Sequence, residues 1–124
     1  MTAQVYIVDD DPVIRTLVED YLSASGYDVK AYENGHAFLE AITKEASGES
    51  AMVLLDLQMP DMSGIDVLKE IKNNSNCARL PVVMLSANNS TEELTSKADV
   101  KADRYLAKPF NPKDILQIVK DYLR

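Results

Sequence analysis

Five short strand-like runs recur along this chain, and each is followed by a segment with helical spacing. The runs are Gln4–Val8, Tyr27–Tyr32, Met52–Leu55, Val82–Leu85 and Arg104–Leu106. In the intervening segments, apolar side chains recur every three or four residues, as in helices that bury one face. Strands that alternate with helices in this way predict a parallel α/β sheet with helices on both faces. Right-handed crossovers then favour a doubly wound topology.

Local signals mark where several of these helices begin and end. Asp11 can cap a helix whose first residue is Pro12, and Gly26 can end it in a left-handed conformation. Ser90 and Glu93 fit a capping box, which predicts the start of a fourth helix. The pattern therefore predicts five helices, one after each strand.

Length and composition are those of one ordinary domain. A chain of 124 residues can bury a core without covalent staples, so we expect a single domain over residues 1–124. Cys77 is the only cysteine, which precludes an intramolecular disulfide, and no signal peptide or membrane span is evident. We therefore expect a soluble, cytoplasmic, reduced protein without membrane insertion. The net charge of −7 and the scattered basic residues argue against direct nucleic-acid binding.

Polar residues with reactive side chains stand at the ends of four of the expected strands. They are Asp9 and Asp10 after the first strand, Asp56 after the third, Ser86 after the fourth and Lys108 after the fifth. In open α/β sheets, sites form outside the carboxyl ends of the strands. Three carboxylates, a hydroxyl and an ammonium group are therefore expected to converge at one edge.

Each of these residues alone has a plainer explanation, but together they favour phosphoryl chemistry. Asp11 is well explained as a helix cap, yet three consecutive aspartates repel one another unless a cation lies among them. Mg²⁺, with Mn²⁺ as a substitute, suits a site formed by Asp10 and Asp56. A carboxylate such as Asp56 can attack phosphorus and form an acyl phosphate, while Lys108 and Ser86 contact phosphate oxygens.

The single histidine does not supply an alternative nucleophile system. His36 lies in a helical stretch between the second and third strands. We expect it at the surface, away from the acidic edge, so no Ser–His or Cys–His pair is available.

Four motifs, in this order and spacing, resemble the response-regulator receiver family over the whole chain. They are Val8-Asp9-Asp10-Asp11-Pro12, Leu54-Leu55-Asp56-Leu57-Gln58-Met59-Pro60 with Gly64, Pro81-Val82-Val83-Met84-Leu85-Ser86-Ala87, and Tyr105-Leu106-Ala107-Lys108-Pro109-Phe110. The resemblance, closest to single-domain chemotaxis regulators, implies a flavodoxin-like (βα)5 fold with strand order 2-1-3-4-5. A chemotaxis member of the family is itself a standard example of that strand order.

The resemblance also implies a set of roles for the residues at this edge. Asp56 would be the phosphoacceptor for a histidine kinase or a histidine phosphotransfer protein. Magnesium would be held by Asp9, Asp10, Asp56 and the backbone carbonyl of Gln58. Lys108 would contact the phosphoryl group and precede a cis peptide bond to proline. The protein would assist its own phosphorylation and dephosphorylation without being an enzyme for a separate substrate.

A switch between two forms follows from the same resemblance. Ser86 would move toward the phosphoryl group, and the ring of Tyr105 would turn inward as that hydroxyl shifts. The fourth helix has the thinnest apolar face, with Leu94 and Ala98 its clearest members, and so the least packing to resist displacement. Its surface, together with the fifth strand and fifth helix, is expected to be the regulated binding face for a downstream protein target.

Two rival families share part of this pattern. Asp9, Asp11 and Val13 satisfy the Asp-x-Asp-x-Val pattern of haloacid-dehalogenase-type phosphatases, but the sixteen residues after Lys108 lack the acidic pair those enzymes need. A flavin-binding module is disfavoured because three aspartates would repel the cofactor phosphate. Within the receiver interpretation, the chain is either a stand-alone protein or one module of a longer regulator. It is expected to be a monomer or a dimer linked to phosphorylation.

Overall fold

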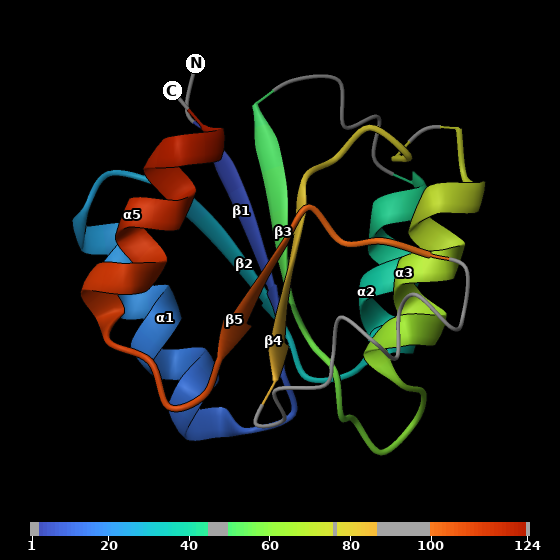
Figure 1. The fold of residues 1–124 in the computed structure, drawn as a ribbon, viewed down its shortest axis with the longest axis horizontal. Helices are drawn as coiled ribbons and strands as arrows, with labels where there is room; N and C mark the ends of the chain where they lie inside the picture. The colour runs from blue at the N-terminus through green and yellow to red at the C-terminus, as the bar shows by residue number, and fades with distance from the viewer. Residues whose placement is uncertain (1–2, 45–49, 76, 87–99, 124) are drawn as a thin grey trace.

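The protein folds around one parallel sheet of five strands in the order β2-β1-β3-β4-β5 (Figure 1). The structure, a computed structural model, describes residues 3–44, 50–75, 77–86 and 100–123. The strands are β1 (Gln4–Val8), β2 (Asp28–Tyr32), β3 (Ala51–Asp56), β4 (Val82–Ser86) and β5 (Arg104–Ala107). The predicted α/β class, doubly wound topology and strand order are confirmed.

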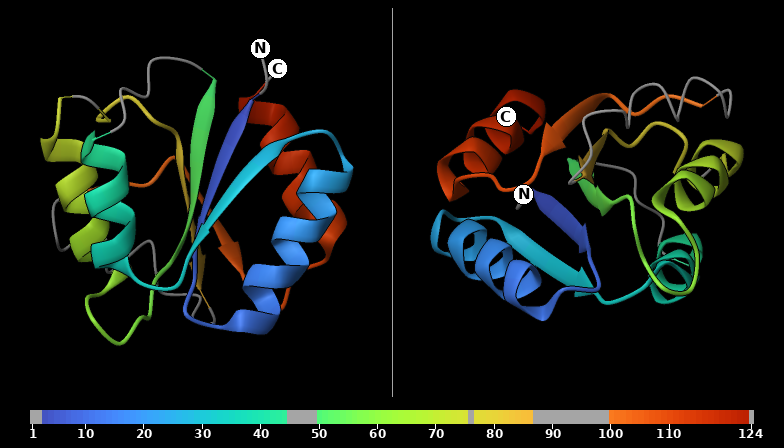
Figure 2. Two further views of the ribbon diagram at one scale, coloured as in Figure 1. Left: turned by 180° about the vertical axis from the view of Figure 1, so that it is seen from behind. Right: turned by 60° about the horizontal axis from the view of Figure 1, so that its bottom comes forward.

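Helices cover both faces of the sheet. Within the described residues they are α1 (Pro12–Ala24), α2 (Gly35–Lys44), α3 (Gly64–Asn73) and α5 (Pro112–Tyr122). Figure 2 shows α1 and α5 on one face and α2 and α3 on the other. None of these helices is long and apolar enough to cross a bilayer. The fourth helix predicted to begin at Ser90, with Glu93, Leu94 and Ala98, lies outside the described residues.

Alternation along the strands divides the core into two halves. Val5 and Ile7 pack with α1 and α5, whereas Tyr6 and Val8 pack with α2 and α3. All six residues of β3 are buried, because this central strand is covered on both faces. The edge strands β2 and β5 are only partly buried.

The predicted helix signals act as expected at both ends of α1. The Asp11 carboxylate accepts a hydrogen bond of 2.9 Å from the Val13 N–H, and Pro12 is the first helical residue. Past the other end, Gly26 has a φ of +98°, a left-handed conformation that glycine adopts without strain. These signals place the start of α1 directly after the aspartates that follow β1.

Gly64 lets the start of α3 approach the end of β3 closely. A β-carbon at this position would lie 2.3 Å from the carbonyl oxygen of Asp56 and 2.8 Å from Cα of Leu57. The Gly64 N–H donates a 2.6 Å hydrogen bond to the carbonyl of Leu57. The loop after β3 is thus held tightly against the strand end that carries Asp56.

Candidate functional site: an acidic edge with one bridging lysine

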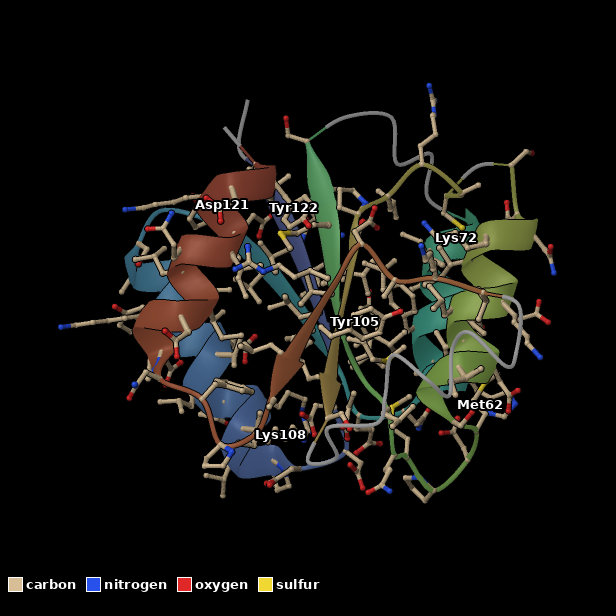
Figure 3. All side chains as sticks on the ribbon, viewed as in Figure 1. Met62, Lys72, Tyr105, Lys108, Asp121 and Tyr122 are labelled. Carbon is tan, nitrogen blue, oxygen red and sulfur yellow. The ribbon has the colours of Figure 1, made fainter. Side chains whose placement is uncertain are left out.

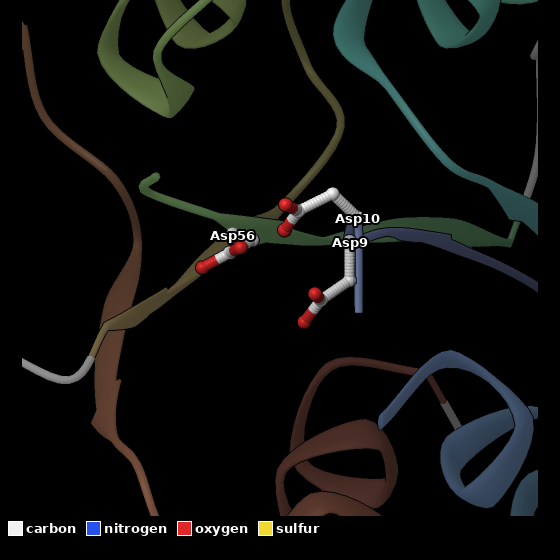
Figure 4. Close-up of side chains that lie close together, drawn as sticks. All are labelled: Asp9, Asp10 and Asp56. Carbon is white, nitrogen blue, oxygen red and sulfur yellow. The ribbon is translucent and has the colours of Figure 1, made fainter. Parts of the chain in front are cut away.

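Three carboxyl groups meet where β1 and β3 end. The two strands pair in register with Val8 opposite Leu55, so Asp9 and Asp56 emerge side by side. Figure 4 shows the side chains of Asp9 and Asp10 leaving the end of β1 near the end of β3. One carboxylate oxygen of each of the three residues lies within 4.8 Å of the others. Asp9 and Asp56 are buried, at 0% and 5% exposure, whereas Asp10 is exposed.

Lys108 connects the two buried carboxylates. Its Nζ lies 3.0 Å from Oδ2 of Asp9 and 3.3 Å from Oδ1 of Asp56. Figure 3 shows this lysine at the same edge of the sheet. Burial lowers the pKa of Lys108, but its hydrogen bond to Asp9 and the two negative charges outweigh this and raise the pKa above its ordinary value. The ammonium group therefore stays charged and partly neutralises the site.

The backbone holds Ser86 next to this lysine. The Lys108 N–H donates a 2.8 Å hydrogen bond to the carbonyl of Ser86, the buried last residue of β4. The peptide bond between Lys108 and Pro109 is cis, as the family resemblance implies. Asp9, Asp10, Asp56, Ser86 and Lys108 thus all lie at the carboxyl edge of the sheet, where the strand pattern predicts them.

The carboxyl group of Asp56 has a raised pKa. Burial and then the charge of Asp9 raise its pKa from 3.8 to about 6, although Lys108 opposes the shift. Asp10 adds to the increase. The Asp56 carboxylate is therefore mostly ionised at neutral pH, and a further cation would relieve the repulsion between it and the neighbouring carboxylates.

Every donor of this acidic cluster is a carboxylate oxygen, which suits a hard divalent cation. Mg²⁺ is typically bound through one or two carboxylates and keeps several other oxygen ligands. Exposed Asp10 leaves one side of the cluster open to solvent, whereas the Asp9 side chain already binds within the protein. Gln58 lies in the loop that leaves this edge, two residues beyond Asp56. The residues present therefore fit a magnesium ion.

Tyr105, for which the family resemblance implies a switch role, lies on β5, away from the carboxylates. It is half-buried and packs against the core half beneath α2 and α3. Its hydroxyl accepts a 3.2 Å hydrogen bond from the Ala102 N–H, and in Figure 3 its ring lies over the middle of the sheet. Tyr105 pairs with Met84 on β4, two residues before Ser86.

His36 does not lie away from this edge, and that expectation was wrong. It lies in the first turn of α2, soon after the carboxyl end of β2, and its Nδ1 lies 2.6 Å from Oδ2 of Asp61 in the loop after β3. Its side chain is 73% exposed, as predicted for a surface residue, and its partner is a carboxylate rather than a serine or cysteine. The prediction failed because the first turn of a helix that follows a parallel strand necessarily lies at the carboxyl edge.

Asp61 secures the loop after β3 to the start of α2. Its carboxylate accepts hydrogen bonds from the N–H groups of Gly35 and His36 at 3.3 and 2.9 Å. Burial pushes the pKa of Asp61 upward, but these N–H groups and the His36 ring outweigh it and lower the pKa to about 2. With Asp10, Glu33, Asn34 and Pro60, Asp61 lines an open pocket of about 540 Å³ beside the acidic cluster.

Arg15, like Asp61, makes a contact that the sequence motifs did not indicate. Its Nη1 donates a 2.8 Å hydrogen bond to the backbone carbonyl of Asp9. The available signal is its position, since it is the first basic residue after the acidic run and lies in the first turn of α1. A long basic side chain in the first turn of α1 can contact the backbone of the loop that carries the aspartates.

Comparison with known protein families gives one consistent answer. The sequence profile of the response regulator receiver domain matches residues 5–120. The transcriptional regulatory protein GltR of Pseudomonas aeruginosa is 34% identical over 120 residues, which are 97% of this chain and 48% of GltR. The alkaline phosphatase synthesis transcriptional regulatory protein PhoP of Bacillus subtilis is 32% identical over the whole chain and 50% of its own length. This chain thus spans about half the length of these relatives.

Solved structures agree with the sequence comparison. The chemotaxis response regulator CheY4 of Vibrio cholerae superposes with a TM-score of 0.88 at 30% identity, covering 99% of this chain and 100% of CheY4. The response regulator TrrA of Thermotoga maritima, solved in complex with Mg(2+)-BeF, has a TM-score of 0.78 at 34% identity, covering 98% of this chain and 100% of TrrA.

Proposed function

Because this chain belongs to the response regulator receiver domain family of two-component signalling, we propose that Asp56 accepts a phosphoryl group from a histidine of a partner protein. The observation that carries this proposal is the convergence of Asp9, Asp10 and Asp56 with a lysine that binds two of them. Receiver domains interact with histidine kinases and downstream effectors and are signalling domains rather than classical enzymes. Membership of this family also argues against the haloacid-dehalogenase-type phosphatase that the first acidic motif suggests.

The proposed transfer uses the carboxylate of Asp56 as the nucleophile. One carboxylate oxygen attacks phosphorus as the bond from phosphorus to the donor nitrogen breaks, and the electron pair of that bond leaves with the imidazole, which then takes up a proton. The raised pKa of Asp56, about 6, still leaves the group ionised at neutral pH. It also shows that negative charge at this edge is costly, so a tetrahedral phosphoryl group needs added positive charge.

We propose that Asp9, Asp10, Asp56 and the backbone carbonyl of Gln58 form the magnesium site, with Mn²⁺ as a substitute. When bound, the ion supplies positive charge that neutralises carboxylate and phosphoryl oxygens. Asp10 is the exposed member of the set, and Asp56 belongs both to the cation site and to the acceptor. The relative TrrA was solved in complex with Mg(2+)-BeF, which supports magnesium binding by this domain.

Lys108 and Ser86 are proposed to stabilise the phosphorylated form. Lys108 already contacts the acceptor at 3.3 Å and would bind a phosphoryl oxygen, while Ser86 would donate a hydrogen bond to another. An acyl phosphate adds roughly one negative charge and new acceptor oxygens, which draws both side chains toward it. Tyr105 on the neighbouring strand would then turn inward and alter the face formed by the fourth helix, β5 and α5.

We propose that residues 1–124 make up one receiver domain, either alone or within a longer regulator. The downstream target is a protein that binds the regulated face, and nucleic acid is not bound directly by this domain. Its acidic charge of −7 supports the second point. The free thiol of Cys77 fits a reducing compartment, which supports a cytoplasmic location. The domain is proposed to be monomeric, or to dimerise on phosphorylation.

The direct test is the intact mass of the protein after incubation with acetyl phosphate and Mg²⁺. A single labile phosphate adduct is expected on the wild type and on Asp66→Ala, which removes an exposed carboxylate on α3. No adduct is expected on Asp56→Ala or after chelation of the metal. A folded wild-type protein that takes up no phosphate, or an adduct that persists in Asp56→Ala, would refute the proposed acceptor.

A further inference from the structure

Arg15 reaches from the first turn of α1 to the loop that carries the aspartates. It is partly buried, and its Nη1 lies 2.8 Å from the carbonyl oxygen of Asp9. This carbonyl belongs to the peptide unit that joins Asp9 to Asp10. The direction of that peptide unit decides where the Asp10 side chain leaves the backbone.

The other hydrogen bonds of Asp9 involve its side chain and its N–H group, whereas its carbonyl is bound by Arg15 of α1. Oδ1 of Asp9 accepts the Asp11 N–H at 2.9 Å, and Oδ2 accepts Lys108 at 3.0 Å. The Asp9 N–H donates to the carbonyl of Tyr32 at 3.1 Å. The side chain of Asp9 is thus held by Asp11 and Lys108 and its N–H by β2, whereas Arg15 binds the carbonyl of the peptide unit that leads to Asp10.

We propose that Arg15 is a positioning residue for the divalent cation site, acting through the Asp9–Asp10 peptide unit rather than through contact with the cation or the phosphoryl group. The inference rests on the proposed function and extends it to a residue outside the carboxylate cluster. Partners that orient metal ligands typically govern metal affinity by about 10- to 100-fold. A hydrogen bond from a guanidinium is also stronger than one between neutral groups.

The sign of the effect separates positioning from simple electrostatics. Arg15 is positively charged, so its removal, considered only as a charge, should make the acidic cluster more attractive to Mg²⁺. Removal of a positioning hydrogen bond should instead weaken binding, because Asp10 no longer starts from the orientation that the cation needs. The two explanations predict opposite changes in affinity.

The experiment compares Mg²⁺ affinity of the whole chain by calorimetric titration at pH 7.5 and constant ionic strength. Arg15→Met keeps a long side chain and a good helix former but removes the charge and the donor. Arg15→Lys keeps the charge and a hydrogen-bond donor group on a shorter side chain. Arg79→Met is the matched control, because it removes an exposed arginine between α3 and β4, at the opposite edge of the sheet. We expect Mg²⁺ to bind about tenfold more weakly to Arg15→Met, with Arg15→Lys intermediate and the control unchanged.

A second readout distinguishes positioning from general loss of structure. In Arg15→Met, the Mg²⁺ concentration for half-maximal labelling by acetyl phosphate should rise about tenfold, while the labelling rate at saturating Mg²⁺ stays near that of the wild type. Metal-free amide spectra should show changes at Asp10 and Asp11 and not across the core. If Arg15→Met does not fold, Arg15→Gln and Arg15→Lys decide the matter, since the affinity order wild type, Lys, Gln is required.

Equal or tighter Mg²⁺ binding by folded Arg15→Met or Arg15→Gln would overturn the inference. A loss confined to the saturated labelling rate would also overturn it, because that result would place Arg15 at the phosphoryl group. Failure of the wild type to bind Mg²⁺ or to label at Asp56 would instead refute the proposed function. The two failures are therefore distinguishable.

Discussion

Replacement of Asp56 by asparagine is expected to stabilise the metal-free protein at neutral pH. The substitution keeps the shape of the buried side chain but removes a charge that is disfavoured by burial and then by repulsion from Asp9 and Asp10. Folding raises the pKa of Asp56 from 3.8 to about 6. A shift of about two units corresponds to about 3 kcal/mol of stability lost when the group ionises in the folded state.

The pH dependence follows from the direction of the shift. Because the pKa of Asp56 is higher in the folded state, its protonated form favours folding. That contribution is complete below about pH 4 and is lost as the pH rises through about 6. The advantage of Asp56→Asn over the wild type should therefore be only about 0.6 kcal/mol at pH 4 and reach about 3 kcal/mol by pH 7.5.

The assay is thermal and urea unfolding in chelator from pH 4 to 8, followed by circular dichroism. For a domain of this length, about 3 kcal/mol corresponds to about 10 °C in Tm. Asp20→Asn on α1, an exposed carboxylate, serves as the control and should change little. Saturating Mg²⁺ should narrow the gap, because the cation stabilises the wild type more than the variant. A gain that is independent of pH, or a variant less stable than wild type at pH 7.5, would refute the reasoning.

Three further substitutions probe the supports of the same edge. Gly64→Ala should lower the free energy of unfolding by more than about 2 kcal/mol and slow labelling by acetyl phosphate, because its β-carbon would lie 2.3 Å from a backbone oxygen. Gly26→Ala, at a φ of +98° with no atom nearby, should lower it by only about 1 kcal/mol in the same urea titration. Equal losses for the two variants would contradict this account. Lys108→Met should destabilise the metal-free protein by about 3 kcal/mol at pH 7.5, because it leaves two buried carboxylates without their cation. Lys113→Met, on the exposed side of α5, should have little effect. Similar unfolding midpoints for the two variants would show that the contacts of Lys108 contribute nothing. Asp61→Asn should lower Tm by a few degrees at pH 6, because the ionised carboxylate caps the N–H groups at the start of α2. Folding lowers the pKa of Asp61 from 3.8 to about 2, so this stabilisation is complete above about pH 4 and is lost as the pH falls toward 2. The difference in Tm between the variant and the wild type should shrink over the same range. A deficit that persists unchanged at pH 2.5 would count against the charged cap.

Much of this molecule could be predicted from local pattern alone. Strand β3 consists of apolar residues up to Asp56, so it had to be buried on both faces, and the parallel topology then placed its end at the functional edge. The start of α1 was evident from Asp11 and Pro12, since capping depends on neighbouring residues. The same rule brought Ser86 and Lys108 to the site, because parallel strands share one carboxyl edge.

Tertiary structure decided what depends on distances between segments. The buried contacts of Asp9 with Lys108, across 99 residues of chain, and the consequent pKa of Asp56 come from how closely the strand ends approach. The hydrogen bond from Arg15 and the pair formed by His36 and Asp61 likewise depend on how the loops fold over the sheet edge. Sequence thus determined which residues reach the edge, because hydrophobic alternation and capping act locally. Only packing determined that Asp9 and Asp56 are buried, that Asp10 is exposed and that Lys108 contacts the two buried carboxylates. The reason is that desolvation and Coulomb interactions depend on three-dimensional separation.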